Sequence, residues 1–278
     1  MNYQELWHRL VRLYDEGEAK AIARMVYEVR FGLTLPDICI GKDTQLSADY
    51  QTELEEIARR LLQHEPVQYV LGEADFCGRT FHVEPGVLIP RPETEDLCRK
   101  IVAAGMKEQA CSILDIGTGS GCIAVTLALD MPQSSVTAWD ISSTALRVAH
   151  NNALRLGAKV DMVENDMLKQ CYGVAPQWDV IVSNPPYICD GEAEAMSSNV
   201  LDYEPELALF VPDDNPLMFY RPIMNYAQSA LFPGGMLWLE CNPLYVELIE
   251  EELQDLGFED VRHHDDQFGK ARFIQAIR

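Results

Sequence analysis

The sequence predicts an α/β fold with a mostly parallel sheet, preceded by a small helical domain. From about residue 112 onward, short runs of β-branched and aliphatic residues alternate with longer amphipathic segments. Repeated β–α units of this kind form parallel sheets with helices on both faces. Before residue 66, apolar residues recur at helical spacing and no strand pattern interrupts them. Hydrophobic residues make up 47% of the 278-residue chain, which suffices for a sizeable core and excludes disordered and fibrous classes.

The clearest helix of the N-terminal part is predicted at residues 47–64. Its apolar residues share one helical face: Leu54, Ile57, Ala58, Leu61 and Leu62. Residues 3–14 and 19–31 have similar spacing, so we expect a helical domain over residues 1–75. Glycines and prolines then separate short β-prone runs at 80–83 and 87–89. This pattern predicts a β-hairpin linker at 76–92, followed by a second domain at 93–278.

Seven strands are predicted in the second domain. They lie at residues 112–116, 135–139, 159–163, 179–183, 235–240, 258–262 and 272–276. Helices are predicted at 122–129, 143–156, 217–231 and 245–256. The loop between the last two strands is too short for a helical crossover, which indicates a terminal antiparallel hairpin.

The charge of the chain is strongly acidic and unevenly distributed. The net charge is −22, and residues 161–278 hold 6 basic against 22 acidic residues. Proteins that bind long nucleic acids need a basic face, so this class is disfavoured. A basic protein partner, docked in part by the acidic C-terminal region, fits the charge better.

Other features limit the location and cofactors. No run approaches 18 apolar residues, and the first residues lack a signal-peptide pattern, so we expect a cytoplasmic protein that binds no membrane. The eight cysteines show no metal-binding spacing and are expected as buried, reduced thiols. His263 and His264 stand beside two aspartates without a further ligand at usable spacing. We expect a solvated loop there and no metal.

A glycine-rich loop follows the first predicted strand of the sheet. Residues 117–121 read Gly-Thr-Gly-Ser-Gly, directly after Asp115 and Ile116. This pattern differs from the dinucleotide-binding GxGxxG and lacks the lysine of a phosphate-binding loop. Asp115 is unhelpful for a pyrophosphate but suits a cationic amine. Glycines permit positive φ and a close approach of a ligand to the backbone.

An aspartate ends the second predicted strand. In doubly wound sheets, an acid at the position of Asp140 accepts hydrogen bonds from ribose hydroxyls. A nucleoside with a positive amine and no phosphate indicates S-adenosylmethionine; a tight structural turn with a surface aspartate is the alternative. At the end of the third strand, Asp166 would accept from the adenine amine and Met167 would pack on the ring, although a polar loop there is the alternative.

The tetrad Asn184-Pro185-Pro186-Tyr187 follows the fourth predicted strand. Prolines stiffen the backbone and remove N–H donors, leaving carbonyls and the Asn184 side chain as acceptors. Asn184 Oδ1 and the Pro185 carbonyl would hold the two N–H bonds of a weakly nucleophilic amide or amine and orient its nitrogen toward a sulfonium methyl. Tyr187 adds an aromatic wall.

These motifs resemble those of the bacterial peptide-chain release-factor glutamine methyltransferases. The resemblance covers nearly the whole chain and includes Pro-Val-Gln-Tyr-Val-Leu-Gly at 66–72, Pro-Arg-Pro-Glu-Thr-Glu at 90–95 and the tetrad. The tetrad alone is shared with adenine-N6 methyltransferases, whereas the combination is more specific. The resemblance implies a Rossmann-like class I S-adenosylmethionine-dependent methyltransferase fold.

The resemblance also implies a function and a set of site residues. The implied reaction is methylation of the glutamine N5 in the Gly-Gly-Gln loop of class 1 release factors by a monomer, with the helical domain holding the protein substrate. The cofactor would be bound by Asp115, Gly117, Thr118, Gly119, Ser120, Gly121, Asp140, Ile141, Asp166, Met167 and Asn184. The substrate would be bound by Asn184, Pro185, Pro186, Tyr187, Arg91, Thr94 and Glu95.

The chain departs from the family pattern at two places. The family usually has a glycine two residues after the Glu of its fifth strand and a glutamine soon after, whereas here Glu240 is followed by Cys-Asn-Pro-Leu-Tyr at 241–245. Met167 stands where a tryptophan is often found beside the adenine. Two alternatives stay open. An adenine-N6 nucleic-acid methyltransferase would need a basic groove, and a non-catalytic scaffold would tolerate loss of the tetrad or glycine loop, both of which are intact.

Overall fold

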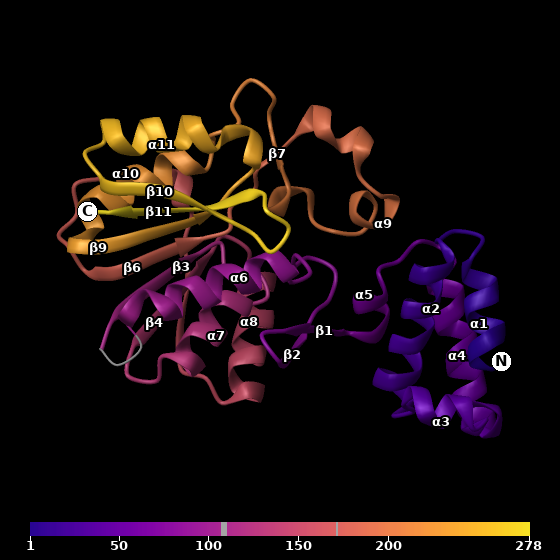
Figure 1. Cartoon of the computed structure of the whole chain (residues 1–278). Helices are drawn as coiled ribbons and strands as arrows, with labels where there is room; N and C mark the ends of the chain where they lie inside the picture. The colour runs from indigo at the N-terminus through magenta and orange to yellow at the C-terminus, as the bar shows by residue number, and fades with distance from the viewer. Residues whose placement is uncertain (107–109, 171) are drawn as a thin grey trace. The chain divides into compact units, whose positions relative to one another are not determined.

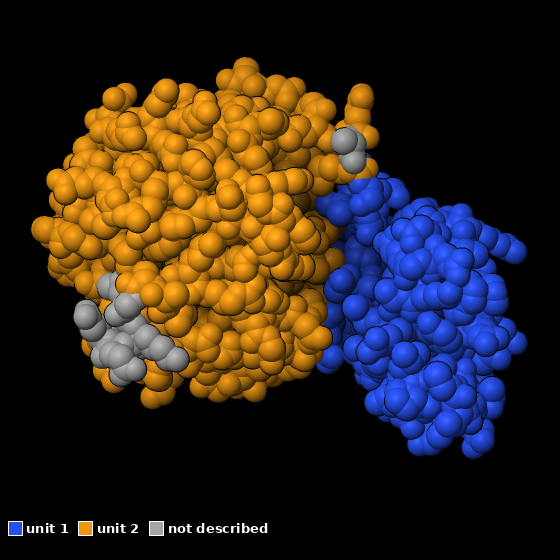
Figure 2. All heavy atoms as spheres, in the orientation of Figure 1, with its two compact units in different colours: residues 1–73, 197–203 blue, residues 74–196, 204–278 orange. Residues whose placement is uncertain are grey.

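The computed structural model describes residues 1–106, 110–170 and 172–278 (Figure 1). They form two compact units, which Figure 2 distinguishes by colour. The first unit comprises residues 1–73 and 197–203, and the second comprises residues 74–196 and 204–278. The first unit thus takes in a short segment from the second half of the chain that sequence analysis does not anticipate.

The first unit is helical. Its helices are α1 (Tyr3–Leu10), α2 (Glu16–Met25), η1 (Val26–Arg30), α3 (Leu35–Cys39), η2 (Lys42–Gln45), α4 (Ala48–Leu61), α5 (Val67–Leu71) and α9 (Ser198–Leu201). The apolar face predicted on α4 is buried, and Leu54, Ala58 and Leu61 have no exposed surface. The sequence analysis did not predict α3 and α5, because one helical turn is too short to show a period.

A short hairpin begins the connection to the sheet. Strands β1 (Glu73–Phe76) and β2 (Arg79–His82) pair across Cys77 and Gly78, which have positive φ angles of 48° and 71°. Residues 87–89, expected as a β-prone run, do not form a strand; the run is short, and the prolines that flank it, Pro85 and Pro90, cannot donate to a ladder. Helix α6 (Pro92–Ile101), followed by η3 (Val102–Met106), was not predicted.

The second unit is built on a seven-stranded sheet, as predicted. Its strands are β3 (Ser112–Ile116), β4 (Ser135–Asp140), β5 (Val160–Glu164), β6 (Trp178–Ser183), β9 (Leu231–Glu240), β10 (Glu259–Asp265) and β11 (Ala271–Ile277). The order is β10-β11-β9-β6-β3-β4-β5. Strands β5, β4, β3, β6 and β9 are parallel, whereas β11 pairs antiparallel with both β9 and β10. The terminal antiparallel hairpin is therefore confirmed.

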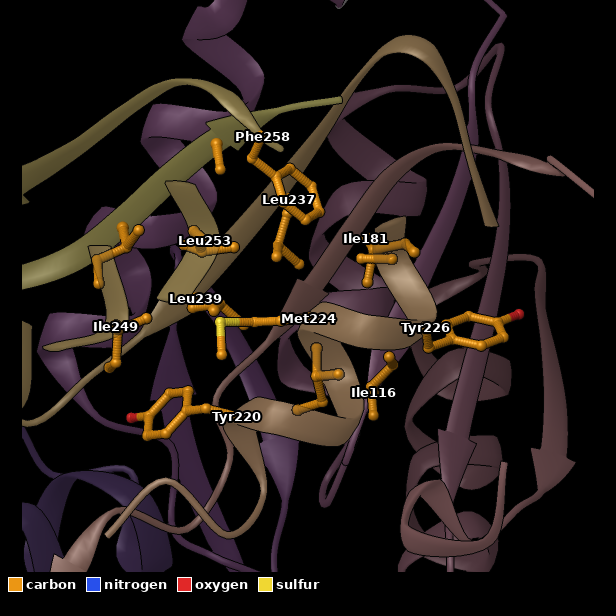
Figure 3. Close-up of a cluster of buried hydrophobic side chains, with 14 of the residues drawn as sticks. Ile116, Ile181, Tyr220, Met224, Tyr226, Leu237, Leu239, Ile249, Leu253 and Phe258 are labelled. Carbon is orange, nitrogen blue, oxygen red and sulfur yellow. The ribbon is translucent and has the colours of Figure 1, made fainter. Parts of the chain in front are cut away.

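Helices cover both faces of the sheet (Figure 1). They are α6 and α7 (Cys122–Asp130) with α8 (Ser143–Leu156) on one face, and α10 (Tyr220–Ala230) with α11 (Val246–Asp255) on the other. Successive residues of one strand serve opposite faces. Val180 and Val182 pack with α6–α8, while Ile181 between them packs with α10 and α11 (Figure 3). Two apolar layers thus bury the sheet and fix its register.

Several short elements lie outside the predicted pattern. Strands β7 (Ile188–Cys189) and β8 (Phe210–Val211) pair in parallel, and between them run the 3₁₀ helices η5 (Asp190–Ala195) and η6 (Glu206–Ala208). Two further 3₁₀ turns are η4 (Met167–Lys169) and η7 (Pro243–Tyr245). Two-residue strands carry no readable alternation, so sequence analysis misses them.

Two expectations about histidines and cysteines need correction. His263 and His264 lie on strand β10 rather than in a loop, and His264 stacks on Trp238 at 5.2 Å between ring centroids. In the described part of the chain, no group of three or more His, Cys, Asp or Glu could hold a metal ion. The cysteines are not uniformly buried, because Cys39 is exposed and Cys77 and Cys122 are half-buried. Cys171 lies outside the described residues.

Candidate active site

The site lies at the carboxyl ends of the parallel strands, where the order of the sheet reverses direction. β3 connects onward to β4 on one side, while its other neighbour is β6. Ile116 and Ser183 end these two strands in register, and Ser183 Oγ donates a 2.7 Å hydrogen bond to the Ile116 carbonyl. Doubly wound sheets bind their ligands at such a switch point.

A largely apolar cavity of about 250 Å³ opens at this point. The loops that follow four successive strands contribute to its wall, so its position follows from the topology of the sheet. Its lining residues are Gly86, Val87, Leu88, Ile116, Gly117, Gly119, Trp139, Asp140, Ile141, Ser142, Ala145, Asn165, Asp166, Met167, Leu168, Ser183, Asn184, Pro185, Pro186, Pro205, Leu207, Ala208, Phe219 and Ile223.

The glycine-rich loop contributes two of its three glycines to the cavity wall. Gly117 and Gly119 have φ angles of +76° and +55°, and a Cβ on either would meet no atom within 4 Å. The backbone is therefore open to a ligand. Gly121 differs, because its Cβ would lie 2.9 Å from the Cβ of Ala149 on α8, and it does not line the cavity. The start of α7 packs so closely on α8 that a side chain at position 121 would clash, which explains the glycine there.

Asp115 is buried at the end of β3, beneath the glycine loop. Its Oδ2 accepts hydrogen bonds from Thr118 Oγ1 at 2.6 Å and from the Ala124 amide at 3.2 Å. Its Oδ1 is buried and has no hydrogen-bond partner among the described residues. Desolvation raises the pKa of Asp115 to about 7. An unpartnered buried carboxylate oxygen of this kind fits a positively charged donor. Ser120, like Thr118, is buried and does not line the cavity.

Asp140 ends β4 and lines the cavity. Its Oδ2 accepts from the Gly119 amide and its Oδ1 from the Ser142 amide, both at 2.9 Å. These bonds fix the carboxylate against the glycine loop, and each oxygen keeps a lone pair for a ligand hydroxyl. Burial raises the pKa of Asp140. Its neighbour Ile141 also lines the cavity and is half exposed.

Asp166 and Met167 follow β5 and line the cavity as well. Met167 is buried, whereas Asp166 pairs with Lys169 at 2.7 Å, an interaction that lowers the pKa of Asp166. Sequence analysis missed their neighbours Asn165 and Leu168. It also missed Trp139, although residues at the end of a predicted parallel strand are a usable signal.

The tetrad leaves β6 at the same edge. Asn184, Pro185 and Pro186 line the cavity, while Tyr187 lies behind them with its hydroxyl donating to Glu240 Oε1 at 3.3 Å. Asn184 Nδ2 donates to Thr94 Oγ1 at 3.2 Å. Within the described ranges, Asn184 Oδ1 accepts no hydrogen bond, so it is available to a ligand.

The three residues expected at the mouth of the site differ in their contacts. Thr94 is buried against Asn184 and Glu240 and does not line the cavity. Arg91 pairs with the buried Glu204. Glu95 accepts from the Cys77 amide at 3.1 Å and pairs with Arg99, away from the cavity wall. Sequence analysis gave no role to Glu204 or Glu240, whose contacts join distant parts of the chain.

Two residues after Glu240, where the family usually has a glycine, this chain has the buried Asn242. Asn242 Nδ2 donates to the Tyr187 carbonyl at 3.2 Å and to Glu192 Oε1 at 2.9 Å. Its Oδ1 accepts from the Leu244 amide at 3.1 Å, which caps η7 just before α11. The departure therefore places a polar side chain where the family usually has none, and this side chain holds the backbone of the tetrad.

The fold and the site together define an S-adenosylmethionine-dependent methyltransferase. Family models for a "Methyltransferase small domain" and a "PrmC N-terminal domain" match residues 80–202 and 6–72. The chain belongs to the release factor glutamine methyltransferase family. A relative of that name from Bacteroides thetaiotaomicron is 46% identical over 96% of this chain and 95% of its own length. One from Flavobacterium psychrophilum is 37% identical over 96% and 94%.

Solved structures agree in fold. A Thermus thermophilus 16S rRNA N2 G1207 methyltransferase, solved with AdoMet and guanosine, has a TM-score of 0.54 and 21% identity over 74% of this chain and 49% of its own. A Pyrococcus furiosus methyltransferase has a TM-score of 0.51 and 18% identity over 83% and 98%. At these identities the likeness concerns the fold alone. No helix in the described ranges is long and apolar enough to cross a membrane.

The residues present fit S-adenosylmethionine. The open backbone at Gly117 and Gly119 accommodates close approach of a ligand. Asp115 is buried and does not line the cavity, but its Oδ1, which has no partner among the described residues, suits an ammonium group. Asp140 offers acceptors for hydroxyls. The buried Met167 and Trp139 provide apolar surface for a ring.

Proposed function

We propose that the protein methylates the side-chain amide nitrogen, N5, of the glutamine in the Gly-Gly-Gln loop of class 1 peptide chain release factors. The names of the relatives support release factors as the substrate. One observation supports the chemistry. Asn184 lines the cavity beside two prolines, and its Oδ1 has no hydrogen-bond partner among the described residues. Two acceptors at this place suit a primary amide, which offers two N–H bonds.

The residues of the tetrad act mainly by orientation. An amide nitrogen is a poor nucleophile because its lone pair is delocalised. Asn184 Oδ1 and the Pro185 carbonyl accept its two N–H bonds and direct the nitrogen into the cavity. Each hydrogen bond contributes about 0.5–1.5 kcal/mol net, whereas good positioning contributes roughly 7–11 kcal/mol. The cofactor, when bound, supplies a methyl group on a positively charged sulfur. The amide loses its proton after transfer, so no general base is needed beforehand.

In this proposal, the acidic surface and the helical unit bind the protein substrate. The excess of acidic residues in 161–278 suits a basic patch around the release-factor loop. Association would then slow as salt concentration rises, because screening shortens the reach of the charges. A salt-independent association rate would contradict this part of the proposal.

The proposal is tested by incubating the purified protein with labelled S-adenosylmethionine and a class 1 release factor. We expect one methyl group on the glutamine of the Gly-Gly-Gln peptide by mass spectrometry, and none when that glutamine is replaced by alanine. Asn184→Ala should abolish transfer while calorimetry still detects cofactor binding. Asn225→Ala, on the surface of α10, is the matched control and should remain active.

The same experiment separates the alternatives. Label appearing in adenine of added DNA or RNA, with an unmodified release factor, would indicate a nucleic-acid methyltransferase. A protein that binds the release factor but no S-adenosylmethionine would indicate a scaffold. Normal turnover by Asn184→Ala would refute the role given to the tetrad.

A further inference from the structure

A chain of two hydrogen bonds links a buried carboxylate to the asparagine of the tetrad. Thr94 Oγ1 lies 2.7 Å from Glu240 Oε2 and 3.2 Å from Asn184 Nδ2. Thr94 lies in the first turn of α6, Glu240 ends β9, and Asn184 directly follows β6. Thr94 and Glu240 are 2% and 1% exposed, so water does not compete for these contacts.

The direction of these hydrogen bonds follows from how many protons each group has. An ionised carboxylate only accepts, so the single hydroxyl proton of Thr94 points to Glu240. The Thr94 oxygen can then only accept from its other neighbour. Asn184 must therefore turn its NH₂ group toward Thr94, and its Oδ1 faces the cavity.

The opposite orientation of the carboxamide would remove the function. With its NH₂ group facing the cavity, Asn184 would present a donor to the N–H bonds of a substrate amide. Because the two ends of a carboxamide have nearly the same shape, packing alone selects weakly between the orientations. A directional hydrogen bond to one end distinguishes them.

We propose that Thr94 and Glu240 are positioning residues, which hold the Asn184 carboxamide with its oxygen toward the substrate amide. This inference rests on the proposed function and extends it to two side chains that do not line the cavity. Their influence reaches the reaction only through Asn184, so they should affect the rate of transfer and not the affinity for S-adenosylmethionine.

The protonation state of Glu240 decides the direction of the chain. Burial raises the pKa of Glu240 to about 7, and Glu93 adds to the rise. Thr94, Arg272 and Tyr187 oppose it through hydrogen bonds or charge. Cys241 beside it is also buried and has a raised pKa. A protonated Glu240 can donate to Thr94, whose own proton then turns to Asn184 and selects the reversed carboxamide.

The first test compares two substitutions of Thr94. Thr94→Val keeps the shape and removes the hydroxyl, and kcat for release-factor methylation at pH 8 should fall at least about tenfold. Thr94→Ser keeps the hydroxyl and should recover kcat to within about threefold of the wild type. The Kd for S-adenosylmethionine should change less than about threefold in both. Thr126→Val is the matched control, because Thr126 is buried outside the site and its hydroxyl has no hydrogen-bond partner among the described residues.

The second test is the pH profile of kcat with both substrates saturating. The wild type and Thr94→Ser should lose rate on the acid side as Glu240 takes up a proton. Glu240→Gln cannot titrate, and Thr94→Val interrupts the chain, so both should lose this acid limb. Asp115 also titrates near neutral pH, but its effect belongs in the KM for S-adenosylmethionine. Far-UV circular dichroism and the Tm identify misfolded variants. If a variant is misfolded, the pH profiles of the wild type and Thr94→Ser still test the inference, because both should lose rate on the acid side.

The outcomes are distinct. A wild-type protein that leaves the glutamine unmethylated overturns the proposed function, and this inference with it. An active wild type with Thr94→Val as fast as Thr94→Ser overturns the inference alone. The inference also fails if kcat of the wild type is independent of pH between 5.5 and about 8, which spans the titration of Glu240.

Discussion

Arg91 Nη2 lies 2.6 Å from Glu204 Oε1, and the other oxygen of this carboxylate accepts from the Ile89 amide at 3.0 Å. The side chain of Glu204 is 1% exposed, whereas that of Arg91 is 31% exposed. The ion pair joins residues 86–91 to the segment that begins at residue 204. Both segments contribute to the cavity wall, so the pair holds two sides of the site together.

Breaking this pair from the arginine side should destabilise the protein. Arg91→Ala leaves a buried carboxylate with one neutral partner, and loss of one member of a buried pair costs about 3–5 kcal/mol. We expect about 2–3 kcal/mol because Arg91 is partly solvated. The double variant with Glu204→Ala should be less destabilised than the sum of the single variants. Urea unfolding measures all three. The exposed pair Arg59–Glu56 is the control and should show no coupling; an additive Arg91–Glu204 cycle would contradict the prediction.

Removing the carboxylate of Asp140 should weaken cofactor binding. Asp140→Ala loses the acceptors expected for the ribose hydroxyls and releases the Gly119 amide. We expect the Kd for S-adenosylmethionine to rise at least about tenfold, a change of roughly 1.4 kcal/mol. Isothermal titration calorimetry measures it. Asp161→Ala, on the exposed side of β5, should bind as the wild type does, and equal affinities of the two variants would count against the role of Asp140.

Asp115 should make the stability of the protein depend on pH in the absence of ligand. Its pKa rises from 3.8 to about 7 in the folded state, so the folded state holds the proton more tightly. The resulting stabilisation is complete below the unfolded pKa and is lost as pH rises through about 7. Asp115→Asn cannot lose a proton, so its free energy of unfolding relative to the wild type should increase between about pH 4 and 7, by at most about 4 kcal/mol.

Urea unfolding across this pH range tests the Asp115 prediction. Asp161→Asn, which changes an exposed aspartate, should run parallel to the wild type. The idea is wrong if the Asp115→Asn curve is parallel as well.

The two glycines Gly121 and Gly157 should respond differently to the same substitution. Both have positive φ, at +81° and +75°. A Cβ at Gly157 meets nothing within 4 Å, so Gly157→Ala costs only the backbone strain, about 1–2 kcal/mol. At Gly121 a Cβ would lie 2.9 Å from Ala149 Cβ and 3.0 Å from its Cα, which adds roughly 1–3 kcal/mol of overpacking. Thermal unfolding compares them, and equal losses would refute the close-packing explanation.

The central strands of the sheet could be predicted because they are buried on both faces. An unbroken apolar run is formed by Val180, Ile181 and Val182. Alternate residues of this run pack into the two hydrophobic clusters on opposite faces of the sheet. Asp115, Asp140 and Asn184 were recognisable as site candidates because each stands at or just after the end of such a run. Their common location then follows from the parallel arrangement alone.

The remainder of the site depends on contacts that no local pattern encodes. Thr94 meets Asn184 across 90 positions of sequence, and Glu204 meets Ile89 across 115. Residues 86–88 and, near η6, Pro205, Leu207 and Ala208 line the cavity although neither segment follows a strand of the main sheet. These groups come together only in the folded chain. From sequence alone, a buried acid such as Glu240 can be recognised only as the end of a strand.

The first compact unit consists of two separated stretches, so the chain passes between the units three times. Tyr203, in the shorter stretch, donates its hydroxyl to the Gln63 carbonyl at 2.7 Å. A fragment that stops at residue 73 would lack this stretch and the bond it makes. Grafting the helical unit of one relative onto the catalytic unit of another therefore requires two matched exchanges rather than one.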